Sequence, residues 1–463
     1  MTDALARLAA AVPPNVRAVC ATLAAAGYQA VTVGGAVRDA LLGRDPGDWD
    51  VATSATPDEV MALFPRSIPT GIQHGTVTVV TGKGEASHVE VTTFRGEGAY
   101  TDARRPDHVT FGVPLVEDLA RRDLRVNAMA YDPAAGVLVD PYGGQQDLAD
   151  RMLRAVGPTG DAYVDGVARF TEDGLRVMRA VRFAAALEFE LDPATERALS
   201  EPGVLASLDK VSRERVSDEL RKTLAARHPS RALAIAERTG VLAHVLPALG
   251  AGLDAWLAYA EAGLAVRVAR GDFVHRWLSR VDAAAPDARL GALVGDLATP
   301  GWRLKRLDRD TVARVTSILK ALKFSNDESA SAGLLAGLSF APLLRAWTPA
   351  EVRRVLADAG RASAPLALSY WRACLASAIT EIDVGAEQLV DAAAGVLSRA
   401  EPIAPKDLAI AGKDLVELGM EPGPKLGVIL GLLFDRVLED PSRNTRETLL
   451  SLSRQLALEV AVG

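Results

Sequence analysis

Cysteine is scarce in this chain, and so are long apolar runs. Only Cys20 and Cys374 occur among 463 residues, and they lie far apart in sequence. Two distant cysteines cannot build a disulfide framework or a cysteine zinc site, which is typical of a reducing compartment. No apolar run reaches the length of a membrane span, because prolines interrupt the alanine-rich start at Pro13 and Pro14. These absences predict a soluble, cytoplasmic protein without a membrane partner.

An excess of positive charge is also missing. The formal net charge is −7 at pH 7. Nucleic-acid binders are often basic, so this balance counts mildly against RNA as a partner, but it does not forbid a local basic groove. None of the six histidines precedes an aspartate, so a histidine–aspartate phosphohydrolase module has no support. The length is sufficient for two to four domains.

The most informative stretch is residues 31–53, VTVGGAVRDALLGRDPGDWDVAT. Its pattern predicts a buried strand, a glycine turn, a short helix and a second strand. The turn at Gly34 and Gly35 lets backbone N–H groups approach a phosphate at the start of the helix. Arg38, on that helix, can add a charge-assisted contact. The stretch therefore predicts a phosphate-binding turn.

Two carboxylates follow this turn. Asp48 and Asp50 stand two residues apart in the second predicted strand, so they share a face, with Trp49 on the other. Such carboxylates repel each other unless a cation lies between them. Mg²⁺ suits the pair, because it takes oxygen ligands and bridges carboxylates to substrate phosphates. A bare Asp-x-Asp is common on solvated loops, but the upstream glycine turn favours a site for a metal-bound nucleoside triphosphate.

A third carboxylate is a candidate. The strand predicted over His88–Phe94 alternates in polarity and presents Glu90 on its polar face. Glu90 would join Asp48 and Asp50 as a catalytic carboxylate if the two strands are neighbours. A surface glutamate fits the sequence equally well.

This stretch closely resembles the nucleotidyltransferase motif of class II tRNA CCA-adding enzymes and bacterial poly(A) polymerases. The residues that carry the resemblance are Gly34, Gly35, Val37, Arg38, Asp39, Leu42, Gly43, Pro46, Asp48, Trp49, Asp50, Ala52, Thr53 and Pro57. The resemblance implies a polymerase-beta-like nucleotidyltransferase head. It also implies that the partners are CTP, ATP and the tRNA 3′ end.

A second motif lies in residues 117–130, EDLARRDLRVNAMA, which we predict to form one helix. Arg122 and Asp123 offer a cation for a triphosphate and an acceptor for a ribose hydroxyl, although such a pair is usually a surface ion pair. The stretch resembles the family motif Arg-Arg-Asp-x-x-x-Asn-Ala. By that resemblance Arg122 meets phosphate, Asp123 meets the ribose 2′-hydroxyl, and Asn127 belongs to the nucleotide site. The family usually has Phe-Thr-Ile before the asparagine, so Arg125 is an extra cation.

A charged stripe occurs in residues 171–183, TEDGLRVMRAVRF, a predicted helix with Thr171 as its cap. Polar positions recur every third residue and form one face: Asp173, Arg176, Arg179 and Arg182. Solvated basic faces have the same pattern. However, a carboxylate acceptor beside a guanidinium donor matches the base edges of C and A and rejects those of G and U. Asp173 and Arg176 are therefore predicted to select the nucleotide.

The stripe also resembles the family motif Glu-Asp-x-x-Arg-x-x-Arg, in which this pair selects CTP and ATP. By resemblance, Arg179 and Arg182 hold phosphates or order the site. The family usually has proline where Gly174 stands, and this departure is expected to loosen the start of the helix.

The rest of the chain is almost wholly helical in pattern. We predict an α+β fold, with a small mixed sheet in a catalytic head over residues 1–155. An all-helical neck over 156–225, body over 226–340 and tail over 341–463 follow, and the tail is assigned to tRNA binding. Helix 211–222 resembles the family pattern Glu-Arg-x-x-x-Glu-Leu.

These features predict a tRNA nucleotidyltransferase that adds the 3′-terminal CCA from CTP and ATP without a template, by two-metal phosphoryl transfer that releases pyrophosphate. An A-adding or CC-adding specialist, a poly(A) polymerase and a non-catalytic RNA-binding protein remain alternatives. The polar segment 95–110 resembles a mobile loop that CC-only enzymes lack, and Gly71–Thr76 is closer to the CCA branch. The intact carboxylates argue against a non-catalytic role. The sequence does not determine the oligomeric state.

Overall fold

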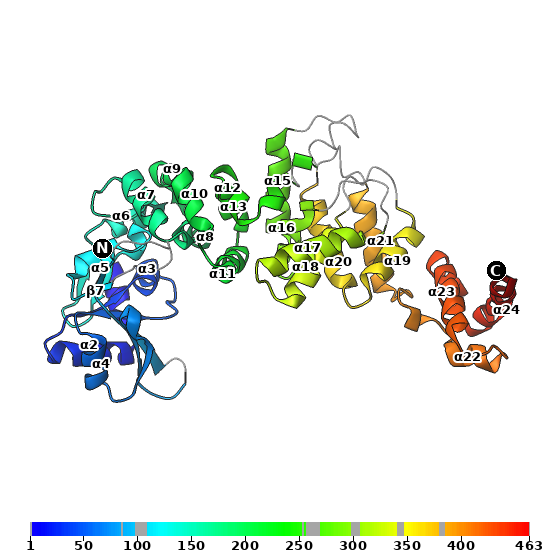
Figure 1. Cartoon of the computed structure of the whole chain (residues 1–463), viewed down its shortest axis with the longest axis horizontal. Helices are drawn as coiled ribbons and strands as arrows, with labels where there is room; N and C mark the ends of the chain where they lie inside the picture. The colour runs from blue at the N-terminus through cyan, green and yellow to red at the C-terminus, as the bar shows by residue number, and fades with distance from the viewer. Residues whose placement is uncertain are drawn as a thin grey trace. The chain divides into compact units, whose positions relative to one another are not determined.

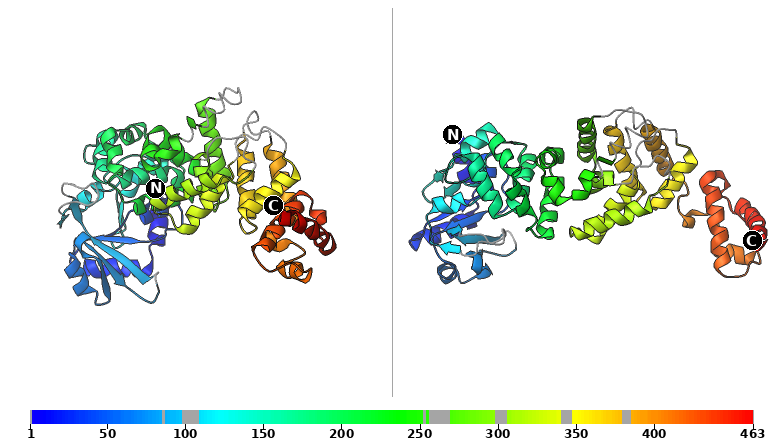
Figure 2. Two further views of the ribbon diagram at one scale, coloured as in Figure 1. Left: turned by 45° about the vertical axis from the view of Figure 1, so that its right-hand side comes forward. Right: turned by 45° about the horizontal axis from the view of Figure 1, so that its top comes forward.

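The chain divides into two compact units, Met1–Val245 and Leu246–Gly463. The computed structural model describes residues 2–84, 87–97, 109–251, 254–255, 269–297, 306–339, 347–378 and 385–462. Figures 1 and 2 show the chain coloured from its blue N-terminus to its red C-terminus. Within the described residues no single helix is both long and apolar enough to cross a membrane, and only a pair bent by 89°, Ala4–Ala11 with Pro14–Ala25, reaches that length together.

A seven-stranded mixed sheet lies in the first unit, with strand order β3-β4-β5-β2-β1-β8-β9. The bounds are β1 Ala30–Val33, β2 Asp50–Thr53, β3 Ser67–Gly71, β4 Thr76–Val80, β5 His88–Thr93, β8 Ala130–Asp132 and β9 Val137–Val139. β2 and β5 are parallel, and the other neighbouring strands are antiparallel. The predicted α+β class with a mixed sheet is therefore confirmed.

Both faces of this sheet are covered. On one face, helices α1 (Thr2–Ala11), α2 (Pro14–Ala25), α3 (Gly35–Leu41) and α4 (Pro57–Leu63) share a core with Val51, Val89 and Val91. Figures 1 and 2 show α2 and α4, in blue, along this side. On the other face, Val33 and Ala52 pack with Leu119 of α5 (Leu115–Ala120). Because strand residues alternate between faces, Asp50 and Glu90 lie on this second face.

The strand predicted from Asp48 is shorter than expected. β2 begins at Asp50, which pairs with Val33, the last residue of β1. Asp48 and Trp49 lie beyond the end of that partner strand, so they have no ladder hydrogen bonds to make. Trp49 is nevertheless buried, as the alternation predicts, whereas Asp48 is exposed.

The single helix predicted over 117–130 is wrong. α5 ends at Ala120, a 3-10 turn η3 covers Arg125–Asn127, and β8 begins at Ala130. The carboxylate of Asp123 accepts the backbone N–H of Leu124 at 2.8 Å, and Leu124 forms an antiparallel bridge with Ala155. These contacts engage the backbone groups that a continuous helix requires.

The helix predicted over 171–183 is two helices. Thr171 lies inside α7 (Ala162–Glu172), so it is not a cap, and α8 (Leu175–Leu187) starts after a break. Asp173 accepts the N–H of Leu175 at 3.0 Å and so satisfies one donor at the new helix start. A Cβ atom on Gly174 would lie 2.4 Å from the carbonyl oxygen of Ser207, so glycine allows the end of α10 to approach this break closely.

Among the other helices of the first unit, α11 and α12 pack most closely against α8. Their bounds are α6 Gly144–Asp150, α9 Pro193–Leu199, α10 Pro202–Leu208, α11 Arg213–Leu224, α12 Pro229–Arg238 and α13 Val241–Val245. The neck that was predicted to be all-helical contains one exception, the two-residue strand β11 (Glu190–Leu191). β11 pairs in parallel with β10 (Met152–Leu153). Strands β6 (Arg95–Glu97) and β7 (Val109–Phe111) form a separate antiparallel pair, and the rest of the predicted loop, 98–108, lies outside the described residues.

The described part of the second unit is helical. Its α-helices are α15 Arg270–Ala283, α16 Arg289–Val294, α17 Arg309–Ala321, α18 Asn326–Gly337, α19 Pro349–Ala359, α20 Ala364–Ala376, α21 Ala386–Ser398, α22 Gly412–Glu417, α23 Pro424–Glu439 and α24 Arg446–Val462. Trp277 and Tyr370 are fully buried among these helices. The finer division of the chain into head, neck, body and tail stays a prediction.

Candidate active site

A cavity of about 730 Å³ opens in the first unit, at the turn after β1 and beside the start of α8. This volume is within the range of small-molecule sites. Every residue that the sequence predicted to bind nucleotide lines it: Gly34, Gly35, Arg38, Arg122, Asp123, Asn127, Asp173, Arg176, Arg179 and Arg182. Asp50 lines it as well. The fold thus brings three separate motifs to one cationic cavity.

Glycine is required at the start of the cavity. Gly34 has φ +77°, a conformation that side-chain-bearing residues rarely adopt, and it precedes α3. A Cβ atom here would lie 2.8 Å from Nη1 of Arg122. Gly34 therefore permits both the turn and the close approach of Arg122.

Arg122 is a cation with incomplete pairing. Its Nη2 lies 3.7 Å from Oδ2 of Asp118, and its buried Nε has no hydrogen-bond partner among the described residues. Burial lowers the pKa of Arg122, and the nearby Asp118 opposes that change. A buried polar group without a partner is costly, so this guanidinium is suited to an anion in the cavity.

Asp123 is held as an ionised acceptor. Its Oδ1 accepts hydrogen bonds from Leu124 N at 2.8 Å and Asn127 Nδ2 at 2.9 Å, and its Oδ2 accepts one from Arg179 Nε at 2.7 Å. Burial on its own would raise the pKa of Asp123, but Arg179 and these hydrogen bonds outweigh it and hold the pKa below its usual range. The carboxylate can accept a further donor from a ligand.

Arg38 differs from the sequence prediction in how its donors are used. Its Nε and Nη2 donate to the two carboxylate oxygens of Asp39, at 2.9 Å each, and its Nη1 donates to Asn127 Oδ1 at 2.6 Å. Its guanidinium carbon lies 5.0 Å from the centre of the Phe183 ring. Arg38 lines the cavity, but these contacts make it an orienting group for Asn127, and so for Asp123.

The acidic side of the site is where β2 and β5 meet. Their parallel register pairs Val51 with Val91, so Asp50 and Glu90 directly precede that pair on neighbouring strands. The two strands are therefore neighbours, which was the condition for Glu90 to join the aspartates. Both residues line a second cavity of about 210 Å³. The side chain of Asp50 is open to the cavities, yet withdrawal of water by the surrounding protein and the charge of Glu90 raise its pKa to about 6. Asp48 adds to the rise, and Arg122 opposes it.

This accumulation of negative charge fits a divalent cation, which would offset the burial and the carboxylate repulsion that together raise the pKa of Asp50. Within the described ranges, no group of three or more His, Cys, Asp or Glu side chains has a metal-binding arrangement. The carboxylates of Asp48 and Asp50 would therefore need water and substrate oxygens to complete a metal's coordination shell. Asp48 is exposed and lines neither cavity.

The predicted selecting pair has partners of its own. Oδ2 of Asp173 accepts a hydrogen bond from Arg215 Nη2 at 3.0 Å. Nη1 of Arg176 donates to Glu172 Oε2 at 2.7 Å. Asp173 and Arg176 both line the cavity, so an incoming base would meet polar groups that are already oriented.

The sequence analysis missed two residues of α11. Arg215 lines the cavity and pairs with Asp173, and Glu219 accepts a hydrogen bond from Arg182 Nε at 2.6 Å. Arg215 and Glu219 are four residues apart, so they occupy one face of α11. That spacing was present in the Glu-Arg-x-x-x-Glu-Leu pattern and could have indicated a helix that faces the stripe.

Comparison with known families gives three matched regions. A model described as "Poly A polymerase head domain" matches residues 30–154, and one described as "Probable RNA and SrmB- binding site of polymerase A" matches residues 188–253. A model for the second domain of tRNA nucleotidyltransferases matches residues 306–452.

Curated relatives and solved structures are similar over most of their length. The CCA-adding enzyme of Lactococcus lactis is 34% identical over 426 residues, covering 92% of this chain and 93% of that protein. The CCA-adding enzyme of Geobacillus stearothermophilus is 41% identical over 335 residues, covering 70% and 76%. The structure of the Bacillus stearothermophilus CCA-adding enzyme in complex with CTP is 31% identical, with a TM-score of 0.64, and covers 98% of this chain and 100% of that one. The Thermotoga maritima CCA-adding enzyme complexed with tRNA, 18% identical with a TM-score of 0.59 and 98% coverage of both chains, shares the fold.

Proposed function

Because the chain belongs to the family of CCA-adding enzymes and is a nucleotidyltransferase, we propose that it adds the 3′-terminal C-C-A of tRNA from CTP and ATP without a nucleic-acid template. One observation carries this proposal. The Gly34–Gly35 turn, the Arg122–Asp123 turn and the Asp173–Arg176 pair all line one cavity, and Asp50 stands at its acidic side.

The residues divide the work by chemistry. Arg122, with its unsatisfied donor, binds the triphosphate, and Asp123 accepts the ribose 2′-hydroxyl. Asp48 and Asp50 would hold Mg²⁺, which would supply positive charge beside the 3′-hydroxyl and the triphosphate. Glu90 belongs to the same acidic cluster and keeps Asp50 in an electrostatic environment that favours a bound cation.

Nucleotide selection is assigned to the start of α8. The carboxylate of Asp173 accepts the amino group that cytosine and adenine both present, and the guanidinium of Arg176 donates to the neighbouring ring nitrogen. Guanine and uracil present a carbonyl where the amino group is needed. Arg179 orders Asp123, and Arg182 is ordered by Glu219.

The decisive experiment supplies CTP and ATP with three RNAs: a tRNA transcript without CCA, one that ends in C-C, and a short RNA unrelated to tRNA. Addition of C-C-A to the first transcript is the expected result. Extension of only the C-C transcript would make the protein an A-adding specialist, and an arrest after C-C would make it a CC-adding one. Long A-tails on the unrelated RNA would make it a poly(A) polymerase, the alternative that the names of two matched family models keep open.

A test variant, a matched control and a chelation experiment examine the assignment of the carboxylates. Asp50→Asn should lower the rate by about a thousandfold, because a cation loses a charged ligand. Asp45→Asn changes an exposed aspartate that lines neither cavity and should leave the rate unchanged. Chelation of divalent metal should abolish addition, and Mg²⁺ should restore it. A location in the cytoplasm, where tRNA that lacks its 3′-terminal CCA is available, is part of this proposal.

A further inference from the structure

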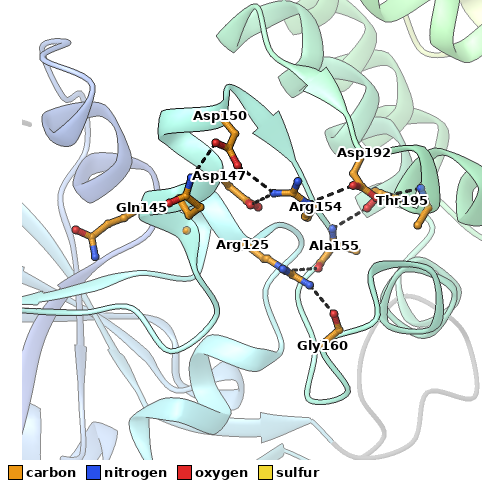
Figure 3. Close-up of polar contacts among 12 residues, drawn as sticks. Arg125, Gln145, Asp147, Asp150, Arg154, Ala155, Gly160, Asp192 and Thr195 are labelled. Carbon is orange, nitrogen blue, oxygen red and sulfur yellow. Dashed lines mark hydrogen bonds and ion pairs between the residues drawn. The ribbon is translucent and has the colours of Figure 1, made fainter.

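Arg125 departs from the family pattern, which usually has threonine at this position. It lies in η3, between Asp123 and Asn127, but it does not line the nucleotide cavity. Its side chain points away to the loop that precedes α7. Nε donates to the carbonyl oxygen of Ala155 at 3.3 Å, and Nη2 donates to that of Gly160 at 2.9 Å, as Figure 3 shows.

The loop that receives Arg125 is itself firmly held. Asp165, a buried residue of α7, accepts hydrogen bonds from Thr159 N at 3.2 Å, Thr159 Oγ1 at 2.9 Å and Gly160 N at 3.0 Å. Asp161 caps α7 by accepting the N–H groups of Tyr163 and Val164. Because these hydrogen bonds hold Gly160 against the first turn of α7, a contact that fixes Gly160 also fixes the start of this helix.

The other end of α7 carries the groups that face the base. α7 ends at Glu172, which pairs with Arg176, and Asp173 follows directly. In its last turn, Arg169 Nη1 donates to the carbonyl oxygen of Ala120 at 3.4 Å. α7 is thus attached at both ends to the segment that carries Arg122 and Asp123.

We propose that Arg125 is a positioning residue for nucleotide selection. It fixes the start of α7 to the Asp123–Asn127 turn and so sets where Asp173 and Arg176 lie relative to the ribose acceptor. The inference rests on the proposed function. The covalent structure of a bound nucleotide limits the distance between its ribose hydroxyl and its base edge. Hydrogen-bond lengths vary by only a few tenths of an ångström, so Asp123 and the Asp173–Arg176 pair must lie at a matching separation. A shift of α7 changes this separation and therefore weakens discrimination between bases more than it weakens binding of the phosphates.

The fold itself does not depend on this side chain. The backbone already joins the two segments, because Arg125 N donates to Arg154 O at 2.9 Å and Leu124 bridges Ala155. Arg154 adds ion pairs with Asp147 and Asp192 in the same region (Figure 3). The backbone pairing does not extend to Gly160, and the side chain of Arg125 supplies that contact. Its removal should leave a folded protein.

The test compares Arg125→Thr with the wild type in steady-state addition to a tRNA that lacks CCA, with CTP, ATP, UTP and GTP supplied singly. The ratio of kcat/KM for CTP to that for UTP should fall about fivefold or more, the factor that corresponds to one hydrogen bond's typical net contribution. Arg125→Lys keeps a charged donor and should recover a large part of the ratio. Arg231→Thr removes a surface arginine of the same unit, paired with Glu190, and should leave the ratio unchanged.

The outcomes separate a positioning role from a structural one. An equal fall for all four nucleotides, or an unchanged ratio in Arg125→Thr, would overturn the inference while the proposed function stands. If Arg125→Thr does not fold, the same ratio in Arg125→Gln, which reaches one of the two carbonyls at most, decides by the same criterion. A wild-type protein that adds neither C nor A would instead overturn the proposed function, and the inference with it.

Discussion

Each unit of the protein places an arginine beside a buried aspartate, and the two arginines differ in how completely they are paired. In the second unit, Arg280 donates through Nε and Nη2 to the carbonyl oxygen of Ala292, at 3.2 and 3.0 Å, and it pairs with Asp296. The exposed fractions of these two side chains are 1% and 3%. In the first unit, Arg122 lies beside two cavities with its Nε unpartnered among the described residues.

This difference separates a structural ion pair from a ligand-binding one. Burial would lower the pKa of Arg280, but its acidic neighbours, with Asp296 first, outweigh burial and raise the pKa above its usual range, so the protein itself favours the charged form. The pKa of Arg122 is lowered, because burial outweighs its acidic neighbours. Arg122 is a partly buried cation beside a cavity that the protein does not fully pair, so an anionic ligand can complete its interactions.

The largest expected effect is on stability, in the second unit. Asp296→Ala leaves Arg280 as an uncompensated buried charge, which should cost about 3–5 kcal/mol of unfolding free energy. Replacing both partners, Arg280→Met with Asp296→Leu, should cost much less. Urea denaturation followed by circular dichroism measures both. Equal losses in the single and double variants would show that the pair is not the source of the effect.

The corresponding change in the first unit should affect activity. Arg122→Met removes the cation that meets the triphosphate and should lower kcat/KM for CTP by about a hundredfold. The urea midpoint should stay the same or rise, because a partly buried and incompletely paired charge has been removed. Steady-state kinetics and urea denaturation of the same preparation test the expected loss of activity and the expected stability, respectively. A marked loss of stability would show instead that Arg122, like Arg280, is a structural residue.

A smaller effect is expected on base selection. Asp173→Asn replaces an acceptor by a group that can also donate, so UTP and GTP should be rejected less strongly, by about 1–3 kcal/mol or 5- to 150-fold. Glu214→Gln, on the exposed side of α11, is a suitable control. Single-nucleotide incorporation assays give the ratios. Unaltered ratios would exclude Asp173 from the selecting pair.

The smallest effect is on pH dependence. The pKa of Asp50 is raised from 3.8 to about 6, so its ionised form, and the rate, should fall about tenfold per pH unit well below 6. Between pH 6 and 4 the folded state binds more protons than the unfolded state, so the contribution of Asp50 to stability increases as pH falls through this window. As pH falls, activity should therefore decrease while the contribution of Asp50 to stability increases. Saturating divalent metal should shift the acidic decline of the rate to lower pH. Asp50→Asn should lack the stability trend, and its persistence there would assign the trend to another group.

Much of the site followed from local sequence patterns. The glycine turn between β1 and α3, the buried Trp49 and the alternation of β5 were predictable because each rests on a short-range rule: left-handed backbone for glycine, and a period of two for strands. The elements around Asp123 and Asp173 were predicted wrongly. Their helical periodicity is real, but Asp123 and Asp173 use their carboxylates to accept nearby backbone N–H groups and so interrupt the helices.

By itself, the sequence determined which chemical groups this protein has for its reaction: carboxylates spaced along a strand, a glycine turn, and a stripe of one acid and three arginines. These follow from periodicity, which a chain carries locally. Only the tertiary structure decided which of these groups line the cavity and which pair with one another. Arg38 turns to Asp39 and Asn127, Arg215 reaches Asp173, and Arg125 reaches Gly160. Such pairings depend on how the sheet, η3, α7, α8 and α11 pack, and packing over long sequence separations is not encoded in any one segment.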